Sequence, residues 1–272
     1  MLLLIGVACL AWGCPAAEEP RTLTLATTTS VRDSGLLDVL LPTFERETGI
    51  EVRIVAVGTG AALRMGREGN ADVLLTHAPP QEKALLEAGV LRRRVPFMEN
   101  AFVIAGPADD SAGIADAGSP EEALHRIEES GASWVSRDDR SGTHLREIAL
   151  FAAAGIDLDE SRLALIRTGS GMGASLQVAG ERRAYLLSDL GTFLAFRERT
   201  GLVAWSWPSE SLRNVYSILQ IAGERLPHPI ARSEAEALER HLLSPEVQRR
   251  IAGFGRERFG RPLFSPLASL QD

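Results

Sequence analysis

The chain alternates strand-like and helix-like segments, and its strand-like segments tend to end in small or hydroxyl residues. Residues 21–26 alternate polar and apolar side chains, as a strand does, and leucines at helical spacing follow over 36–44. Between them lie the hydroxyl residues of 27–30. The same order returns at 50–57, where a β-rich run leads into Gly58, Thr59 and Gly60. This alternation predicts a layered α/β fold with a mostly parallel sheet.

The same pattern continues along the chain. Further strands are expected at 71–76, 100–105, 133–136, 163–167, 184–187, 203–207 and 215–222. Helices are expected at 61–67, 81–87, 120–129, 143–154, 172–182, 189–199 and 233–254, the last with a break at Ser244 and Pro245. Residues 107–119, rich in Gly, Ala, Asp and Pro, mark a change of domain. The charged run Arg92–Arg94 is expected to be a solvated face.

Composition excludes several classes of protein. The 272 residues are 45% hydrophobic, which is typical of a globular chain with a real core. The net charge of -7, with both signs interspersed, argues against nucleic-acid binding and supplies no basic patch for anionic lipid. Both cysteines lie within the first fourteen residues, so the rest of the chain can form neither a disulfide nor a cysteine metal site. The histidines show no paired spacing, and no protein-bound metal cation is expected.

The first 20 residues are expected to be an export leader. Residues 1–12 form an uncharged apolar run that is too short for a mature membrane span and is typical of a signal-peptide core. The run that ends at Cys14 resembles a lipoprotein processing site, with Cys14 as the lipidated residue; cleavage near Ala17 is the alternative. Either way we expect an exported protein.

Five turns between strand and helix carry small or hydroxyl residues. They are 27–30, 58–60, 137–143, 169–173 and 188–192. In open α/β sheets, ligands bind where strands end and helices begin, and the free N–H groups there favour anions. One such turn is an ordinary helix cap. Five of them predict a cleft between two domains with N–H groups converging from both sides.

The segment 137–144 admits three interpretations. Arg137 can pair with two oxygens of one tetrahedral anion, beside the hydroxyls of Ser141 and Thr143. It can instead pair internally with Asp138 or Asp139. A third possibility is a secreted serine hydrolase using Ser141 and His144 with Asp139, although no G-x-S-x-G motif surrounds the serine.

Motifs along nearly the whole chain, from about residue 22 to 264, resemble the tungstate-binding substrate-binding proteins of bacterial ABC transporters. The motifs occur in order at 26–30, 33–37, 57–60, 71–75, 77–79, 102–107, 136–138, 141–144, 171–173 and 191–192. The chain departs from the family's pattern at Asp138, where Gly is common, at Leu190, where Arg is common, and in the neighbours of Tyr216, the tyrosine expected in the second crossing segment. These departures concern fine selectivity rather than the fold.

The resemblance implies a two-lobed type II periplasmic binding protein, with a mixed, mostly parallel sheet and flanking helices in each lobe and a ligand cleft between them. It implies a leader at 1–20, a first lobe of 21–105 plus 218–272, and a second lobe of 106–217. The implied ligands of a metal-free oxyanion are Thr28, Thr29, Ser30, Thr59, Arg137, Ser141, Thr143, Gly171 and Met172. Of these, Ser30 is also expected to cap the first helix.

The resemblance also implies a function and a partner. We expect a monomeric, non-enzymatic receptor, without a cofactor, at the periplasm or the outer face of the cell membrane, which captures tungstate and delivers it to an ABC transporter permease. Molybdate is the first alternative ligand, with sulfate and phosphate behind it.

Overall fold

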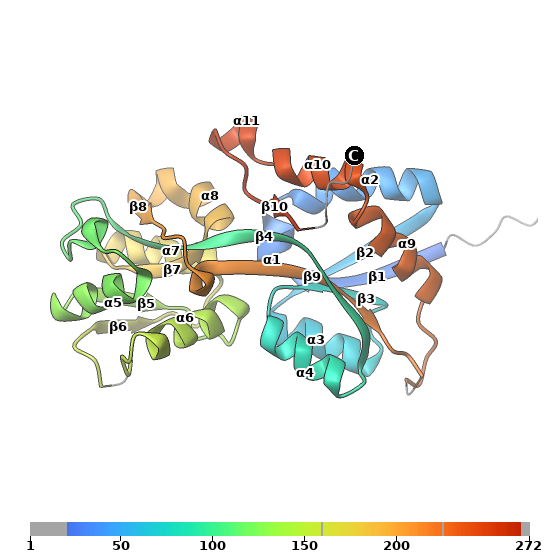
Figure 1. Cartoon of the computed structure of the whole chain (residues 1–272), viewed down its shortest axis with the longest axis horizontal. Coiled ribbons are helices and arrows are strands. Elements are labelled where there is room, and N and C mark those ends of the chain that lie inside the picture. Colours follow the sequence, from blue (N-terminus) through green and yellow to red (C-terminus); the bar gives the residue numbers. More distant parts are fainter. Residues whose placement is uncertain (1–20, 159, 225, 268–272) are drawn as a thin grey trace, which may run out of the picture.

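Two long strands organise this molecule. The computed structural model describes residues 21–158, 160–224 and 226–267. Within them the strands are β1 (Arg21–Thr28), β2 (Ile50–Val57), β3 (Val73–Thr76), β4 (Leu91–Pro107), β5 (Ser133–Ser136), β6 (Ala164–Arg167), β7 (Leu186–Asp189), β8 (Leu202–Trp205), β9 (Arg213–Ile221) and β10 (Ser265–Pro266). The long pair, β4 and β9, runs side by side between two groups of elements (Figure 1).

The helices cover both faces of the strands. They are α1 (Thr29–Asp33), α2 (Leu36–Thr48), α3 (Thr59–Glu68), α4 (Pro79–Glu87), α5 (Pro120–Glu129), α6 (Gly142–Ala153), α7 (Met172–Arg182), α8 (Leu190–Thr200), α9 (Arg232–Leu242), α10 (Pro245–Gly253) and α11 (Arg256–Phe259), with short 3₁₀ turns η1 (Ile114–Asp116) and η2 (Glu210–Leu212). Most of the expected helices and strands are confirmed, with ends displaced by one to a few residues. The predictions missed the first half of β4, the short helix α11 and β10.

The first lobe consists of β1 to β3 with the adjoining parts of β4 and β9, together with α1 to α4 and α9 to α11. The strand order is β10-β4-β9-β3-β1-β2. One face of this sheet carries a core that includes Leu23 and Leu25, and the opposite face carries a second core around Ala26. Because successive side chains of β1 point to opposite faces of the sheet, this one strand contributes side chains to both cores.

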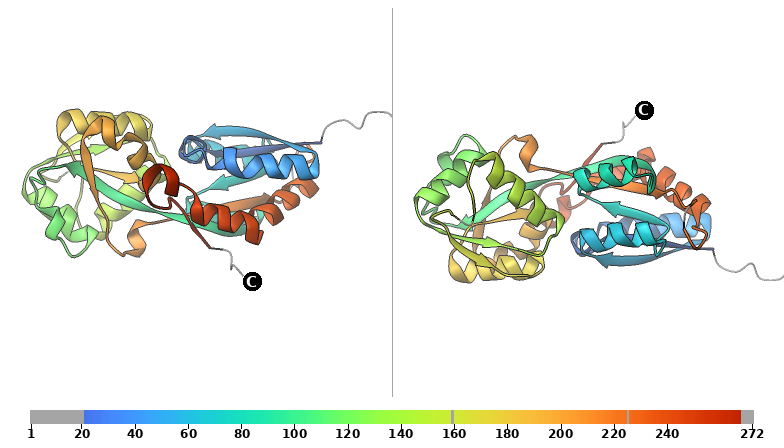
Figure 2. Two further views of the ribbon diagram at one scale, coloured as in Figure 1. Left: turned by 90° about the horizontal axis from the view of Figure 1, so that it is seen from above. Right: turned by 90° about the horizontal axis from the view of Figure 1, so that it is seen from below.

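The second lobe contains β5 to β8 and α5 to α8. β4 joins it to the first lobe: residues 91–101 pair with β9, and Phe102–Pro107 pair with β7 or β8. Two cores flank these strands, one beneath α5 and α6 that includes Trp134 and one beneath α7 and α8 that includes Leu176. Views from above and below show the lobes connected by the crossing strands (Figure 2). The proposed domain boundaries at 105/106 and 217/218 fall in β4 and β9, and they stay a prediction.

The sheets are mixed, as expected, and the pairings between strands that belong to a single lobe are parallel. β1 is parallel to β2 and β3, and β5 is parallel to β6. An isolated parallel bridge also joins Trp134 of β5 to Tyr185. The pairings made by β4 and β9 are antiparallel: β9 with β3, and β4 with β7, β8, β9 and β10. The reason is that β4 and β9 cross between the lobes in opposite directions, so each adds an antiparallel strand to an otherwise parallel set.

The Arg92–Arg94 run is only partly solvated, because it lies on β4 rather than on a surface helix. Arg94 is 12% exposed in its side chain and pairs with the fully buried Glu82 of α4. Arg93 is 59% exposed. The alternation of the strand thus separates neighbouring arginines into buried and solvated ones.

Candidate functional site between the lobes

A tightly turned loop joins β5 to α6 and carries Arg137. Asp138 and Arg140 adopt positive φ angles of 47° and 56°, which bend the chain sharply back. Asp139 Oδ1 accepts a hydrogen bond of 3.0 Å from the backbone N–H of Ser141. Ser141 then caps α6, since its Oγ accepts from the backbone N–H of His144 at 3.3 Å. The loop therefore presents Arg137 from a fixed backbone.

The guanidinium of Arg137 is buried and only partly paired. Its residue is 8% exposed, and one terminal nitrogen forms an ion pair with Asp139. Burial raises the pKa of Asp139, but hydrogen bonds from Ser141 and the charge of Arg137 outweigh it and leave that pKa lowered. The Nε–H of Arg137 has no partner within the described residues. A buried cation with an open donor is a natural anion contact.

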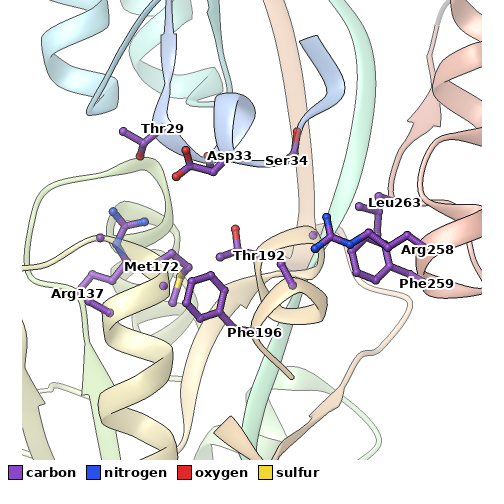
Figure 3. Close-up of a pocket in the computed structure, with 16 residues that line it drawn as sticks. Thr29, Asp33, Ser34, Arg137, Met172, Thr192, Phe196, Arg258, Phe259 and Leu263 are labelled. Carbon is purple, nitrogen blue, oxygen red and sulfur yellow. The ribbon is translucent and has the colours of Figure 1, made fainter. Parts of the chain in front are cut away.

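Arg137 lines a cavity of about 270 Å³ between the lobes (Figure 3). Thr29 and Asp33 face Arg137 across it, and the C-terminal segment closes another side (Figure 3). The lining residues are Thr29, Ser30, Asp33, Ser34, Arg137, Gly171, Met172, Gly173, Ala174, Gly191, Thr192, Ala195, Phe196, Arg258, Phe259 and Leu263. Five of the nine proposed ligands are among them: Thr29, Ser30, Arg137, Gly171 and Met172.

The start of α7 forms one wall of the cavity. Gly171 precedes this eleven-residue helix in extended conformation and has no side chain to cap it. The first N–H groups of α7 lack intrahelical partners and carry the positive end of the helix dipole. This wall can therefore donate hydrogen bonds to an anion without a formal charge.

The other four proposed ligands lie outside the cavity lining. Thr28 caps α1, because its Oγ1 accepts from the N–H of Val31 at 3.4 Å and contacts Ser30 Oγ at 3.1 Å. The expectation that Ser30 is the cap was therefore wrong. β1 continues to Thr28, which leaves that residue at the helix boundary. Thr59, Ser141 and Thr143 are buried at the starts of α3 and α6.

The sequence prediction missed residues from two other elements. Thr192 lines the cavity from α8, which begins at its cap Asp189; the Oδ1 of Asp189 accepts from the N–H of Thr192 at 2.9 Å. The small-residue turn at 188–192 was the signal for this wall. Arg258 and Phe259 come from α11 and line the opposite end. No motif in the sequence indicated this C-terminal segment.

A row of polar side chains lies where the crossing strands meet the lobes. His77 Nδ1 lies 2.8 Å from Asn214 Oδ1, and the ring stacks on Tyr216 at 4.8 Å between centroids. The amide nitrogen of Asn214 donates to Asn100 and to the Tyr216 hydroxyl, both at 2.8 Å. Burial lowers the pKa of His77, although the Asn214 contact and the charges of Asp189 and Glu82 oppose this. His77 is therefore neutral near pH 7.

Below the Arg137 loop lies a buried carboxyl group. Glu147 of α6 is 1% exposed, and burial raises its pKa to about 7 against the opposing effects of Ser136, Trp134 and the backbone N–H of Arg137. The nearby charge of Asp138 raises it further.

The geometry around Ser141 differs from that of a hydrolase. The Ser141 hydroxyl accepts from the backbone of His144, and the His144 ring nitrogen Nδ1 accepts from the backbone N–H of Arg140 at 3.0 Å. The other ring nitrogen faces Asp138 at 3.7 Å. Both imidazole nitrogens are thus directed away from the serine that a nucleophile–base pair would require.

Two lobes joined by crossing strands, with a cleft between the lobes, define the class of two-lobed ligand-binding proteins. Comparison with known proteins gives the same class. The family model described as a PBP superfamily domain matches residues 15–239. The tungstate-binding protein TupA of Peptoclostridium acidaminophilum is 39% identical over 99% of this chain and 96% of its own length. TupA of Campylobacter jejuni is 35% identical over 86% and 87%.

Solved structures give the same result. The tungstate-binding protein TupA of Desulfovibrio alaskensis G20 matches with a TM-score of 0.81 and 37% identity, over 92% of this chain and 100% of that one. The tungstate ABC transporter structure from Geobacter sulfurreducens matches with a TM-score of 0.76 and 39% identity, over 86% and 98%. The chain therefore belongs to the PBP superfamily, in the family of the TupA tungstate-binding proteins.

The described ranges contain neither a candidate membrane span nor a candidate metal site. No helix there is long and apolar enough to cross a membrane. No group of three or more His, Cys, Asp and Glu side chains there is arranged to hold a metal ion. The predicted leader and Cys14 lie outside the described residues.

Proposed function

We propose that this protein binds a tetrahedral oxyanion between its lobes, and that the anion is tungstate. The observation that carries the proposal is the open Nε–H of the buried Arg137 at the inter-lobe cavity. A guanidinium in that position keeps a donor unsatisfied until an acceptor arrives. An oxyanion supplies both the acceptor and the balancing charge.

The rest of the cavity suits a metal-free oxyanion site. Thr29 and Ser30 contribute hydroxyls from the first lobe, and the N–H groups near Gly171 and Met172 contribute from the second. The remaining proposed ligands, Thr28, Thr59, Ser141 and Thr143, lie outside the cavity lining and stay predictions. Tungstate is favoured over other tetrahedral anions by the names of the relatives at 35–39% identity.

Delivery to a membrane permease follows as a second part of the proposal. A relative of Haloferax volcanii, 39% identical over 91% of this chain and 72% of its own length, is described as a putative ABC transporter anion-binding protein. An exported monomer, tethered through Cys14 or cleaved near Ala17, would meet such a permease outside the cytoplasm. Mass spectrometry of the mature N-terminus tests the anchor.

Alternative anions share the same chemistry. Molybdate matches tungstate in charge and shape, whereas sulfate is smaller and would leave donors unsatisfied at a cost of roughly 1 to 3 kcal/mol each. A hydrolase is disfavoured, because the His144 ring nitrogens are engaged by Arg140 and directed to Asp138.

Calorimetric titration with tungstate, molybdate, sulfate and phosphate tests the proposal. We expect tungstate to bind tightly, and Arg137→Ala to weaken it by roughly 1.5 to 3 kcal/mol because a charge-assisted hydrogen bond is lost. Arg182→Ala is the matched control, since Arg182 is an exposed arginine at the far end of α7. Binding of none of the four anions, or an unchanged dissociation constant for Arg137→Ala, would contradict the proposal.

A further inference from the structure

The two lobes touch through the first residues of two helices. The backbone N–H of Gly142, at the start of α6 in the second lobe, donates to Thr59 Oγ1, at the start of α3 in the first lobe, at 3.2 Å. Both residues are buried. The first N–H groups of a helix have no partner within the helix, so this one is satisfied by the opposite lobe.

This contact depends on the missing side chain of Gly142. A Cβ at this position would lie 3.1 Å from His77 Cε1, 3.4 Å from His77 Nδ1 and 3.4 Å from Thr59 Oγ1. All these atoms belong to the first lobe. The absence of a side chain therefore sets how closely α6 can approach the first lobe.

His77 cannot easily move out of the way. Its ring stacks on Tyr216 with an interplanar angle of 29°, and Nδ1 bonds to Asn214 on the crossing strand β9. The Asn214 nitrogen already donates to two oxygens, so its Oδ1 is the acceptor and His77 Nδ1 carries the proton. The ring is thus fixed by the strand that joins the lobes.

We propose that Thr59, Gly142 and His77 form an inter-lobe latch that couples anion binding to closure. The proposal rests on the function above. A hydroxyl has one proton to donate and two positions that accept. Thr59 Oγ1 uses one accepting position for Gly142, and this bond forms only when the lobes lie close together. The same approach brings the walls of the inter-lobe cavity around the anion, so occupancy and closure reinforce one another.

The direct test is Gly142→Ala. Gly142 lies within α6 and its φ is not in the left-handed range, so alanine suits the local backbone and raises helix propensity. The added methyl should nevertheless hold the lobes apart. We expect tungstate affinity about tenfold weaker, chiefly through faster dissociation, and a smaller decrease in the radius of gyration by X-ray scattering on ligand addition.

Gly253→Ala is the matched control. Gly253 is a helical glycine in α10 whose added Cβ meets nothing within 4 Å. This variant should bind and compact like the wild type. A Gly142→Ala protein that binds within twofold of the wild type and compacts equally would overturn the latch.

Substitutions of Thr59 give an independent test. They separate a role of its hydroxyl group from a role of its shape alone. Thr59→Val keeps the shape but removes the hydroxyl, whereas Thr59→Ser keeps the hydroxyl. We expect Thr59→Val to weaken binding and Thr59→Ser to retain most of it. Gly142→Ala should cost less when it is combined with Thr59→Val than when it is made alone, because the two residues act through one contact. Strictly additive effects would contradict the coupling.

Experiments can distinguish a failure of the latch from a failure of the proposed function. If the wild type bound no anion, the function would be wrong. The latch would still be measurable, because ligand-free Gly142→Ala should then have a larger radius of gyration than the ligand-free wild type, and equal radii would overturn it.

Discussion

Arg137 is only partly paired within the part of the protein that the structure describes. Asp139 neutralises part of the guanidinium and is itself held in the ionised form by Ser141 and Arg137. The Nε–H has no partner within the described residues, and Arg137 lines the cavity. Internal pairing of Arg137 and anion binding, which the sequence left as alternatives, are therefore compatible, because a guanidinium offers five donors in a planar fork.

The buried carboxyl group of Glu147 predicts how the stability of the protein depends on pH. Its pKa rises from 4.5 to about 7 on folding, because burial disfavours the charged form. The folded state therefore holds more protons than the unfolded state between these values, and stability falls as pH rises through this window. Above pH 7 the full cost, about 3 kcal/mol, is present.

Glu147→Gln should remove most of this pH dependence, since an amide does not ionise. Urea unfolding at pH 5 and pH 8 measures it: the wild type should lose much more stability at pH 8 than the variant. Glu181→Gln, at an exposed position of α7, should behave like the wild type. Equal losses in the wild type and Glu147→Gln would show that the pKa of Glu147 is not raised on folding.

At the scale of elements, α4 is fastened to β4 by a buried ion pair. Glu82 is fully buried and accepts from Arg94 Nε, from Thr76 Oγ1 and from the N–H of Ala78, at 2.8, 2.7 and 2.8 Å. This carboxylate thus ties the end of β3, the start of α4 and the first half of β4 together. Its charge depends on Arg94 for compensation.

Arg94→Ala should therefore destabilise the protein by about 3 to 5 kcal/mol, because it leaves a buried carboxylate without its counter-charge. Arg92→Ala is the control: Arg92 pairs with the half-exposed Glu236, and such pairs contribute about 0 to 1 kcal/mol. Chemical denaturation of both variants measures the difference. Losses of similar size would refute the assigned role of the Arg94–Glu82 pair.

Most helices and strands were predictable from the sequence, and the exceptions have physical reasons. The expected bounds of α5, β5 and α7 agree with the structure, because each has clear periodicity and Ser, Pro or Gly at its start. The first half of β4 was missed because its charged run, Arg92–Arg94, does not look like a strand. The sequence did not indicate which strands pair antiparallel, because local sequence says little about which strand crosses between the lobes.

At the scale of the whole molecule, the site arises from segments far apart in the chain. The turns after β1 and β5 and before α7 were predictable, because strand ends and helix starts gather at one edge of an α/β layer. Arg258 and Phe259 were not, since α11 is a four-residue helix placed only by the packing of the C-terminal segment. The contact of Thr59 with Gly142 could not be predicted from the sequence either, because it exists only when both lobes are assembled.

The central claim is that an oxyanion binds between the lobes beside Arg137. Anomalous diffraction at the tungsten absorption edge, from crystals grown with tungstate, tests it most directly. The account predicts one dominant tungsten peak in the inter-lobe cavity, with an oxygen within hydrogen-bonding distance of Arg137 Nε. A fully occupied tungsten peak elsewhere on the protein, with the inter-lobe cavity free of tungsten, would contradict it.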